Sequence, residues 1–281
     1  MSEENFPFRG VEHTVLQGKK GVRQAYDCMS ITYDYSEYLH RTRGMEEAEG
    51  RAIRRWFSKL LGPVLDVGCG TGRYAVRVAK MGSEVVALDA SSRMLEKAIE
   101  KARRHNAVEK ISPVVGDGEH LPFRAQSFNG MICTLTLDHF PHCELSAREF
   151  ARVLRKDALC ILTCLNSYTL NDFKRRHKLP YDKVPFRTEF LSPVLIYEVG
   201  HSANELKGLF EKYGFTAIDV EGCCYWRILP MALINLYRTE LDYSPLFSSL
   251  FSLLSRVLSI LNVFKSFLKY AEIHGSLLRR D

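Results

Sequence analysis

Residues 64–72 read Val64-Leu-Asp-Val-Gly-Cys-Gly-Thr-Gly72, and this stretch decides the fold. A short apolar segment runs into Asp66, three glycines follow at every second position, and a helical pattern begins after them. A strand that passes through a glycine-rich turn into a helix lets the backbone approach a ligand closely, with the helix N-terminus facing it. The stretch therefore predicts the opening strand, loop and helix of a nucleotide-binding βαβ unit.

A second acid and the glycine spacing indicate which nucleotide would bind. Asp89 ends the next apolar run, about where a ribose-binding carboxylate belongs in such a unit. The glycines read G-x-G-x-G rather than the G-x-G-x-x-G of dinucleotide sites, and Asp66 stands just before them. A carboxylate there would repel a pyrophosphate, but it could serve a ligand that has an ammonium group and no phosphate. S-adenosylmethionine is such a ligand; the alternative is a tight turn in another α/β protein.

Residues 64–72, with Asp89 behind them, closely resemble motif I of the class I S-adenosylmethionine-dependent methyltransferases. The longer patterns around them resemble the branch that contains the ubiquinone and menaquinone C-methyltransferases. The resemblance implies an α/β, Rossmann-like fold with a seven-stranded, mostly parallel sheet and helices on both faces. It also implies methyl transfer with S-adenosyl-L-methionine as the cofactor, and no metal site is expected.

Strand-like and helical patterns alternate along the chain, which is typical of a parallel sheet. We expect an N-terminal helical cap at 1–61, the S-adenosylmethionine-binding core at 62–228, and a helical insertion followed by the last core strand at 229–281. Within these segments, residues 1–20 are expected to be loose and residues 166–200 irregular. The expected strands are 64–67, 84–88, 112–115, 130–135, 158–165, 215–220 and 272–278, and the expected helices lie within 21–61 and at 72–81, 91–106, 145–154, 203–213, 229–241 and 245–270.

The resemblance assigns the glycine loop to the methionine part of the cofactor. Gly68, Gly70 and Gly72, with Cys69 among them, would let the backbone pass close to this part. Asp66 would hold the ammonium group, directly or through water. Alternatively, or in addition, its carboxylate would orient the glycine loop.

Residues after the second and third strands would hold the adenosine part. Asp89, next to Ala90, would accept both ribose hydroxyls, although an acid here could also serve a helix N-terminus. Met94 stands where the family places an apolar side chain against the adenine, and a core methionine is the alternative. Asp117 would accept from the adenine amine, while the Gly118 N–H would donate to the ring.

The remaining candidates surround the sulfonium. An aromatic face at Tyr33 offers cation–π attraction, or it only attaches the N-terminal helices to the core. The fourth strand ends in Thr134-Leu-Thr-Leu-Asp-His-Phe-Pro-His142, and ligands bind at such carboxyl ends, so Thr134 is expected at the cofactor. Asp138 and His139 are the catalytic candidates, as a base or a substrate contact, or they line and cap the pocket. They replace an arginine-asparagine element of the quinone enzymes.

The C-terminal helix pattern bears on the methyl acceptor. Residues 245–270 carry an apolar stripe that is too interrupted to predict a membrane span. The stripe fits a lid over the active site, an interfacial helix on a membrane surface, or an oligomer contact. A small lipophilic acceptor, such as a quinone precursor or a lipid-like compound, would explain the first two. The stripe consists of Leu250, Leu254, Val257, Leu261, Phe264 and Leu268.

Two other functions stay open. The net charge of +6 permits weak attraction to RNA or anionic membranes without demanding either. The basic run at 173–178, with Arg54, Arg55, Arg103 and Arg104, could serve a tRNA or RNA methyltransferase, although such faces are usually solvated surface. A non-catalytic binding protein that keeps the cofactor fold is the third reading. The eight cysteines and the polar first residues predict a cytoplasmic protein that could associate with a membrane surface.

Overall fold

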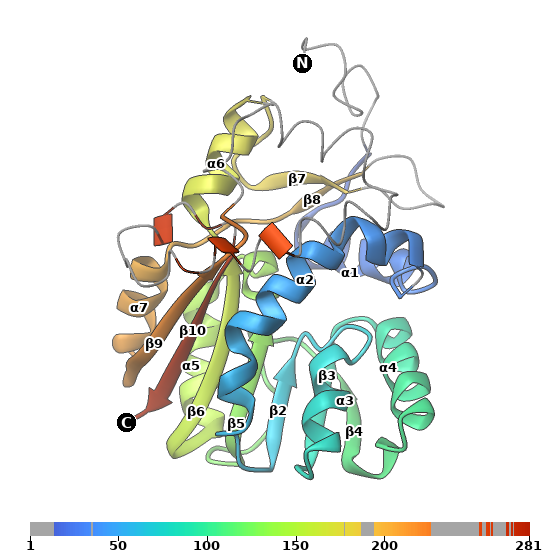
Figure 1. Ribbon diagram of the computed structural model, residues 1–281, viewed down its shortest axis with the longest axis vertical. Coiled ribbons are helices and arrows are strands. Elements are labelled where there is room, and N and C mark those ends of the chain that lie inside the picture. The colour runs from blue at the N-terminus through green and yellow to red at the C-terminus, as the bar shows by residue number, and fades with distance from the viewer. Residues whose placement is uncertain are drawn as a thin grey trace.

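The computed structural model (Figure 1) describes residues 14–34, 36–176, 178–186, 194–225 and 273–281, with single positions between 253 and 271. Its main sheet has the order β4-β3-β2-β5-β6-β10-β9 and is parallel except for β10. The strands are β2 (Val64–Val67), β3 (Val85–Asp89), β4 (Ile111–Val115), β5 (Phe128–Thr134), β6 (Leu154–Leu165), β9 (Phe215–Cys223) and β10 (Ile273–Arg280). The helices are α1 (Gly18–Met29), α2 (Ser36–Phe57), α3 (Arg73–Lys80), α4 (Ser92–Arg104), α5 (Cys143–Val153), α6 (Ser167–Arg176) and α7 (Ala203–Glu211), with 3-10 turns η2 (Val108–Lys110) and η3 (Leu137–His139).

Helices cover both faces of this sheet because its central strands are apolar on both sides. In β2, Val64 belongs to one hydrophobic cluster, while Leu65 and Val67 belong to the other. The first cluster contains side chains of α2, α3 and α4, and the second contains side chains of α5 and α7. Figure 1 shows α2 and α3 in front of the sheet and α5 behind it. The predicted Rossmann-like α/β fold is therefore confirmed.

The strand order reverses beside β2, and this reversal positions the site. The chain passes from β2 outward to β3 and β4, and then returns to place β5 on the other side of β2. In open parallel sheets, ligands bind at the carboxyl ends of the strands where the order reverses. The glycine loop that follows β2 lies at this point.

Helix α2 is fixed to the sheet by a buried tryptophan. Trp56 is fully buried, and its Nε1 donates to the Asp219 carboxylate of β9 at 3.2 Å. We expect Trp56→Ala to lower the free energy of unfolding by about 3–5 kcal/mol, because the truncation leaves a cavity in the core. Urea unfolding at equilibrium measures this loss. The control Leu61→Ala, at a side chain that is 71% exposed, should change the free energy of unfolding by less than about 0.5 kcal/mol. A loss below about 1 kcal/mol for Trp56→Ala would contradict the role of Trp56 in the core.

Two expectations about irregular segments were wrong. Residues 166–200 contain α6 and two strands, β7 (Lys183–Phe186) and β8 (Val194–Tyr197), and the expected loose N-terminus contains β1 (Thr14–Val15) and the start of α1. These strands form a second sheet in the order β1-β8-β7. Local patterns could not show it, because β8 pairs with a strand far away in the sequence. Pro185 is tolerated because β7 is an edge strand.

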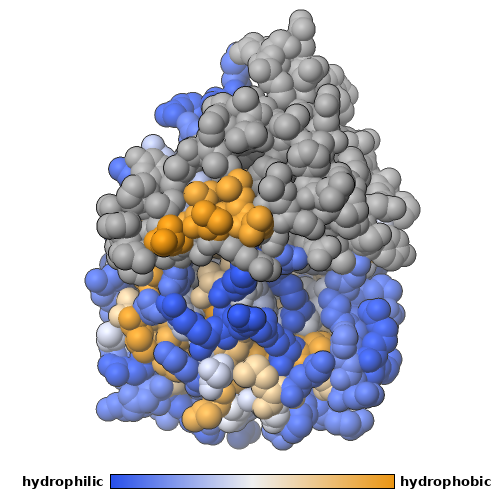
Figure 2. All heavy atoms as spheres, in the orientation of Figure 1, coloured by the Kyte–Doolittle hydropathy of each residue, from blue (hydrophilic) through white to orange (hydrophobic). Residues whose placement is uncertain are grey.

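The last strand was predicted correctly, at 273–280 instead of 272–278, and lies antiparallel between β6 and β9. The helix expected at 229–241 lies outside the described residues, as does most of 245–270. Of the described positions there, Leu253, Val257 and Ile260 are exposed, and Figure 2 shows apolar surface where this segment lies. Among the described residues, no helix is long and apolar enough to cross a membrane.

Candidate active site

A cavity of about 980 Å³ opens at the carboxyl ends of β2, β3, β4 and β5. This volume is at the upper end of the range for small-molecule pockets. Most of the predicted site residues line it: Tyr33, Asp66, Gly68, Cys69, Gly70, Asp89, Ala90, Asp117, Gly118, Thr134, Asp138 and His139. The structure therefore brings together residues from segments that are distant in the sequence.

The three loop glycines have different tasks. All three have positive φ angles, +67° at Gly68, +53° at Gly70 and +79° at Gly72. A Cβ on Gly70 would meet no atom within 4 Å, whereas one on Gly68 would collide with Thr136 and one on Gly72 would lie 2.9 Å from the Ala98 Cβ. Gly70 thus leaves open space for a ligand. Gly72 instead lets α3 pack against α4, and it does not line the cavity.

Asp89 is half-buried and holds the glycine loop. One carboxylate oxygen accepts from the Gly70 N–H and the other from the Ser91 N–H, each at 2.8 Å. Burial raises the pKa of Asp89, against the lowering effect of these two hydrogen bonds. A carboxylate has about four acceptor positions, so both oxygens can still accept from a ligand. The pair of ribose hydroxyls fits this arrangement.

Asp66 lies beneath the loop and is almost completely buried. It accepts a backbone hydrogen bond from Ala75 in the first turn of α3, so it does orient the segment that follows the glycines. Burial nevertheless raises the pKa of Asp66 to about 7, with a further increase from the charge of Asp89. A bound ammonium group would favour the ionised form, and a buried acid that lines a cavity fits such a ligand.

Asp117 has a partner that the sequence did not indicate. The Lys19 ammonium of α1 forms ion pairs with Asp117 and, at 2.6 Å, with Glu119. Partial burial acts to raise the pKa of Asp117, but Lys19 and the Glu119 N–H outweigh it and lower that pKa. Gly118 is required because a Cβ there would collide with Phe140. The acid and the N–H expected at the adenine therefore lie on the cavity, with a lysine beside them.

Met94 does not contact the cavity, so its expected place against the adenine is corrected to the core. Its backbone N–H donates to the Ser91 side chain, which caps α4, and its own side chain is 1% exposed. The helical turn directs the Met94 side chain into the protein. Proximity to Asp89 in the sequence could not decide between the two roles.

The two catalytic candidates are both held by internal bonds. Both Asp138 carboxylate oxygens lie 3.2 Å from the Leu165 N–H, and the side chain is buried. His139 Nδ1 lies 2.9 Å from the Tyr197 carbonyl, and its Nε2 lies 2.9 Å from the Tyr26 hydroxyl. Because a carbonyl only accepts, Nδ1 carries the proton and Nε2 accepts from Tyr26. These contacts support the reading that both residues line and position the pocket.

Several cavity residues were missed by the sequence reasoning, among them Lys19, Tyr26 and Glu198. Tyr26 lies in a segment that was correctly expected to be helical, but nothing in the sequence indicated that its side chain reaches the cavity. Lys19 and Glu198 lie in segments that were expected to be loose or irregular. Their roles depend on α1 and β8 packing together, a contact that local patterns do not encode.

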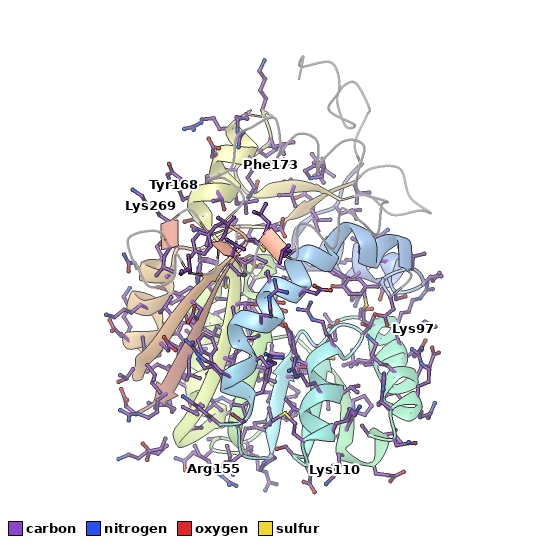
Figure 3. All side chains as sticks on the ribbon, in the orientation of Figure 1. Lys97, Lys110, Arg155, Tyr168, Phe173 and Lys269 are labelled. Carbon is purple, nitrogen blue, oxygen red and sulfur yellow. The ribbon has the colours of Figure 1, made fainter. Side chains whose placement is uncertain are left out.

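Part of the basic set that an RNA substrate would need is engaged in contacts within the protein. Lys174 is buried and donates to the backbone carbonyls of Tyr181 and Glu198. Arg175 and Arg176 pair with Asp172 on the same helix. Figure 3 shows Lys110 and Arg155 at the end of the molecule opposite α6, away from the carboxyl ends of the parallel strands. Arg104, in contrast, lines the cavity with Arg23 and with Lys19 and Lys101, which pair with Asp117 and Asp34. The cavity therefore carries basic side chains, and an RNA substrate stays an alternative that a tRNA methylation assay decides.

Comparison with known proteins decides the family. A family model described as "Methyltransferase domain" matches residues 64–157. The demethylmenaquinone methyltransferase of Staphylococcus aureus is 30% identical over 168 residues, which are 56% of this chain and 68% of that protein. The chain belongs to the class I S-adenosylmethionine-dependent methyltransferases. This methyltransferase therefore uses S-adenosylmethionine as its cofactor.

The chain is similar to two further proteins, one a curated relative and one a solved structure. The bifunctional biotin-biosynthesis protein BioHC of Cellvibrio japonicus is 30% identical over 157 residues, 56% of this chain and 30% of that protein. The matched part of the chain therefore covers less than a third of the length of BioHC. A solved S-adenosylmethionine-dependent methyltransferase from Mesorhizobium loti has the same fold, with a TM-score of 0.52 at 16% identity, covering 83% of this chain and 98% of its own. At this identity, only the fold is shared.

Proposed function

We propose that the enzyme methylates a small lipophilic acceptor of the quinone-precursor or lipid-like class. The observation that carries this proposal is the cavity, which extends beyond the acids at the glycine loop to Leu135, Phe140 and Leu165. A small-molecule pocket of this size has room for a cofactor and a second compound. The similarity to an enzyme named demethylmenaquinone methyltransferase supports the same acceptor class.

We propose that the predicted cavity residues hold the cofactor, which supplies an electrophilic methyl group on a sulfonium. Asp66 would hold its ammonium group, Asp89 its ribose hydroxyls, and Asp117 with Gly118 its adenine. The open space beside Gly70 and the unused acceptor positions of Asp89 fit this group. The protein itself contributes alignment and a pocket from which water is excluded.

Helix α1 and the turn after it close the cofactor end of the cavity. The Ser91 hydroxyl donates to Asp27 at 2.5 Å, and the Lys101 ammonium donates to Asp34 at 2.9 Å. With the Lys19 pairs, these contacts attach residues 18–34 to the loops at the strand ends. Burial behind this segment strengthens each electrostatic contact to the cofactor. Entry of the cofactor then requires these contacts to open.

Calorimetry and a product assay test the proposal. We expect S-adenosylhomocysteine to bind to one site, and a short-chain demethylmenaquinol to be methylated when S-adenosylmethionine is present. Bulk tRNA should give no product, and mass spectrometry distinguishes the two substrates. Cofactor binding with methylation of tRNA alone would overturn the acceptor class. Absence of any heat with folded protein would overturn the assigned cofactor site.

A further inference from the structure

Glu198 presents an uncommitted carboxylate to the cavity. The residue follows β8, lines the cavity, and has a side chain that is 16% exposed. Its Oε1 lies 3.8 Å from His139 Nε2, which is beyond hydrogen-bonding distance. Within the described part of the chain, no donor is within hydrogen-bonding distance of this carboxylate. Glu198 can therefore accept a proton from a ligand.

The neighbouring polar side chains have no such capacity. Asp138 lines the cavity but is only 1% exposed, and burial raises the pKa of Asp138 well above its ordinary value, which favours the protonated form. The two ring nitrogens of His139 are taken by Tyr197 and Tyr26. A proton released into the cavity beside η3 therefore meets Glu198 as its available acceptor.

The backbone of Glu198 is fixed from several directions. Its N–H donates to the Asp182 carbonyl at 3.0 Å, and its own carbonyl accepts from the buried Lys174 ammonium. The next N–H, of Val199, donates to the Asp138 carbonyl at 2.8 Å. Catalytic groups need such support, because a misplaced base loses most of its effect. These bonds also explain why Lys174 is buried instead of solvated.

We propose that Glu198 is the catalytic base that receives the acceptor's proton, with His139 and Tyr26 as positioning residues beside it. This inference rests on the proposed function. As the new bond forms between the acceptor atom and the methyl carbon, the carbon–sulfur bond breaks and its electron pair stays on sulfur. The proton lost by the acceptor atom passes to a Glu198 carboxylate oxygen, so charge and atoms balance.

The surroundings of Glu198 suit a base. Burial raises the pKa of Glu198, while the charge of Lys174 acts against this increase. Burial and the charge of Glu198 also raise the pKa of Asp138, which packs against it. A base with a raised pKa accepts a proton more readily near neutral pH. Since the carboxylate is the active form, activity should fall as the pH decreases through the pKa of Glu198.

The test compares Glu198→Gln with the wild type and with Glu211→Gln, a matched control on the exposed end of α7. With a short-chain demethylmenaquinol, kcat should fall about 100-fold in Glu198→Gln, and the acidic limb of its pH profile should disappear. Glu211→Gln should behave like the wild type. A second readout needs no acceptor: Glu198→Gln should weaken cationic S-adenosylmethionine about fivefold relative to neutral S-adenosylhomocysteine, because it removes a negative charge near the sulfonium.

Each outcome decides the proposal. A kcat within threefold of wild type with an unchanged pH profile would overturn it. If the wild type binds S-adenosylhomocysteine but does not methylate the probe, the proposed acceptor class is wrong. The role of Glu198 is then tested by the ratio of the affinities for S-adenosylmethionine and S-adenosylhomocysteine, compared between Glu198→Gln and the wild type. An unchanged ratio would overturn the role of Glu198, and a shifted ratio would support it. Loss of S-adenosylhomocysteine binding in Glu198→Gln alone would indicate a structural role, also against the proposal.

Discussion

Asp89→Ala is expected to weaken S-adenosylhomocysteine binding about a thousand-fold. The Asp89 carboxylate is half-buried at the end of β3, and its oxygens accept from Gly70 and Ser91 while facing the cavity. Each hydrogen bond from a ribose hydroxyl to a charged acceptor contributes about 1.5–3 kcal/mol, and the variant removes both. Isothermal titration calorimetry on both proteins measures the change.

Two comparisons separate ligand contact from loop disorder. Asp89→Asn keeps one acceptor oxygen and should bind with intermediate affinity. Glu100→Ala removes an exposed carboxylate of α4 that pairs with Lys97, and it should bind like the wild type. The thermal transition of Asp89→Ala should stay within a few degrees of wild type, because the lost loop bonds are offset by relief of a buried charge. An affinity within threefold of wild type would exclude Asp89 from the ribose site.

The glycine loop and the core strands could be predicted because their signals are local. Residues 64–72 combine an apolar strand, glycines that need positive φ, and an amphipathic helix, and each feature is readable within one window. The same alternation predicts where the strands end, so the sequence alone predicts that Asp66, Asp89 and Asp117 lie close together. Parallel topology then brings their carboxyl ends to one edge.

The acceptor end of the cavity could not be predicted, because it depends on long-range pairing. β8 is placed by its pairing with β1 and β7 and by its packing against α1. Glu198 is an ordinary glutamate in the sequence, and it becomes notable only when β8 carries it to His139. Met94 shows the same dependence on packing. The family resemblance placed its side chain against the adenine, whereas the packing of α4 buries it in the core.

Asp66→Asn is expected to stabilise the ligand-free protein at alkaline pH and to remove the pH dependence of cofactor binding. The pKa of Asp66 is about 7 in the folded protein, against 3.8 ordinarily, chiefly because of burial. The unfolded chain therefore releases this proton at lower pH, and stability falls as the pH rises from about 4 to about 7. At about 1.4 kcal/mol for each pH unit between two pKa values, the ionised form costs about 4 kcal/mol above pH 7.

Asparagine carries no charge at any pH, so the variant should be more stable than wild type at pH 8.5 by up to about 4 kcal/mol. The two proteins should be nearly equal at pH 4. Denaturant unfolding at both pH values measures this difference. Asp117→Asn is the control, because it should not stabilise the protein at pH 8.5. Lys19 lowers the pKa of Asp117, so the ionised carboxylate stabilises the folded protein. Removing that charge should therefore give no gain in stability.

Ionisation of Asp66 should lower the stability of the ligand-free protein but increase its affinity for the cofactor. These two opposite pH dependences make the prediction specific to Asp66. An ammonium group favours the ionised Asp66, so wild-type affinity for S-adenosylhomocysteine should rise as the pH increases through 7. Binding at pH 7 should release protons, which calorimetry in two buffers of different ionisation enthalpy detects. Asp66→Asn should bind weakly and without this proton release. A carboxylate that only orients α3 would leave affinity independent of pH near 7, and that result would remove Asp66 from the ammonium site.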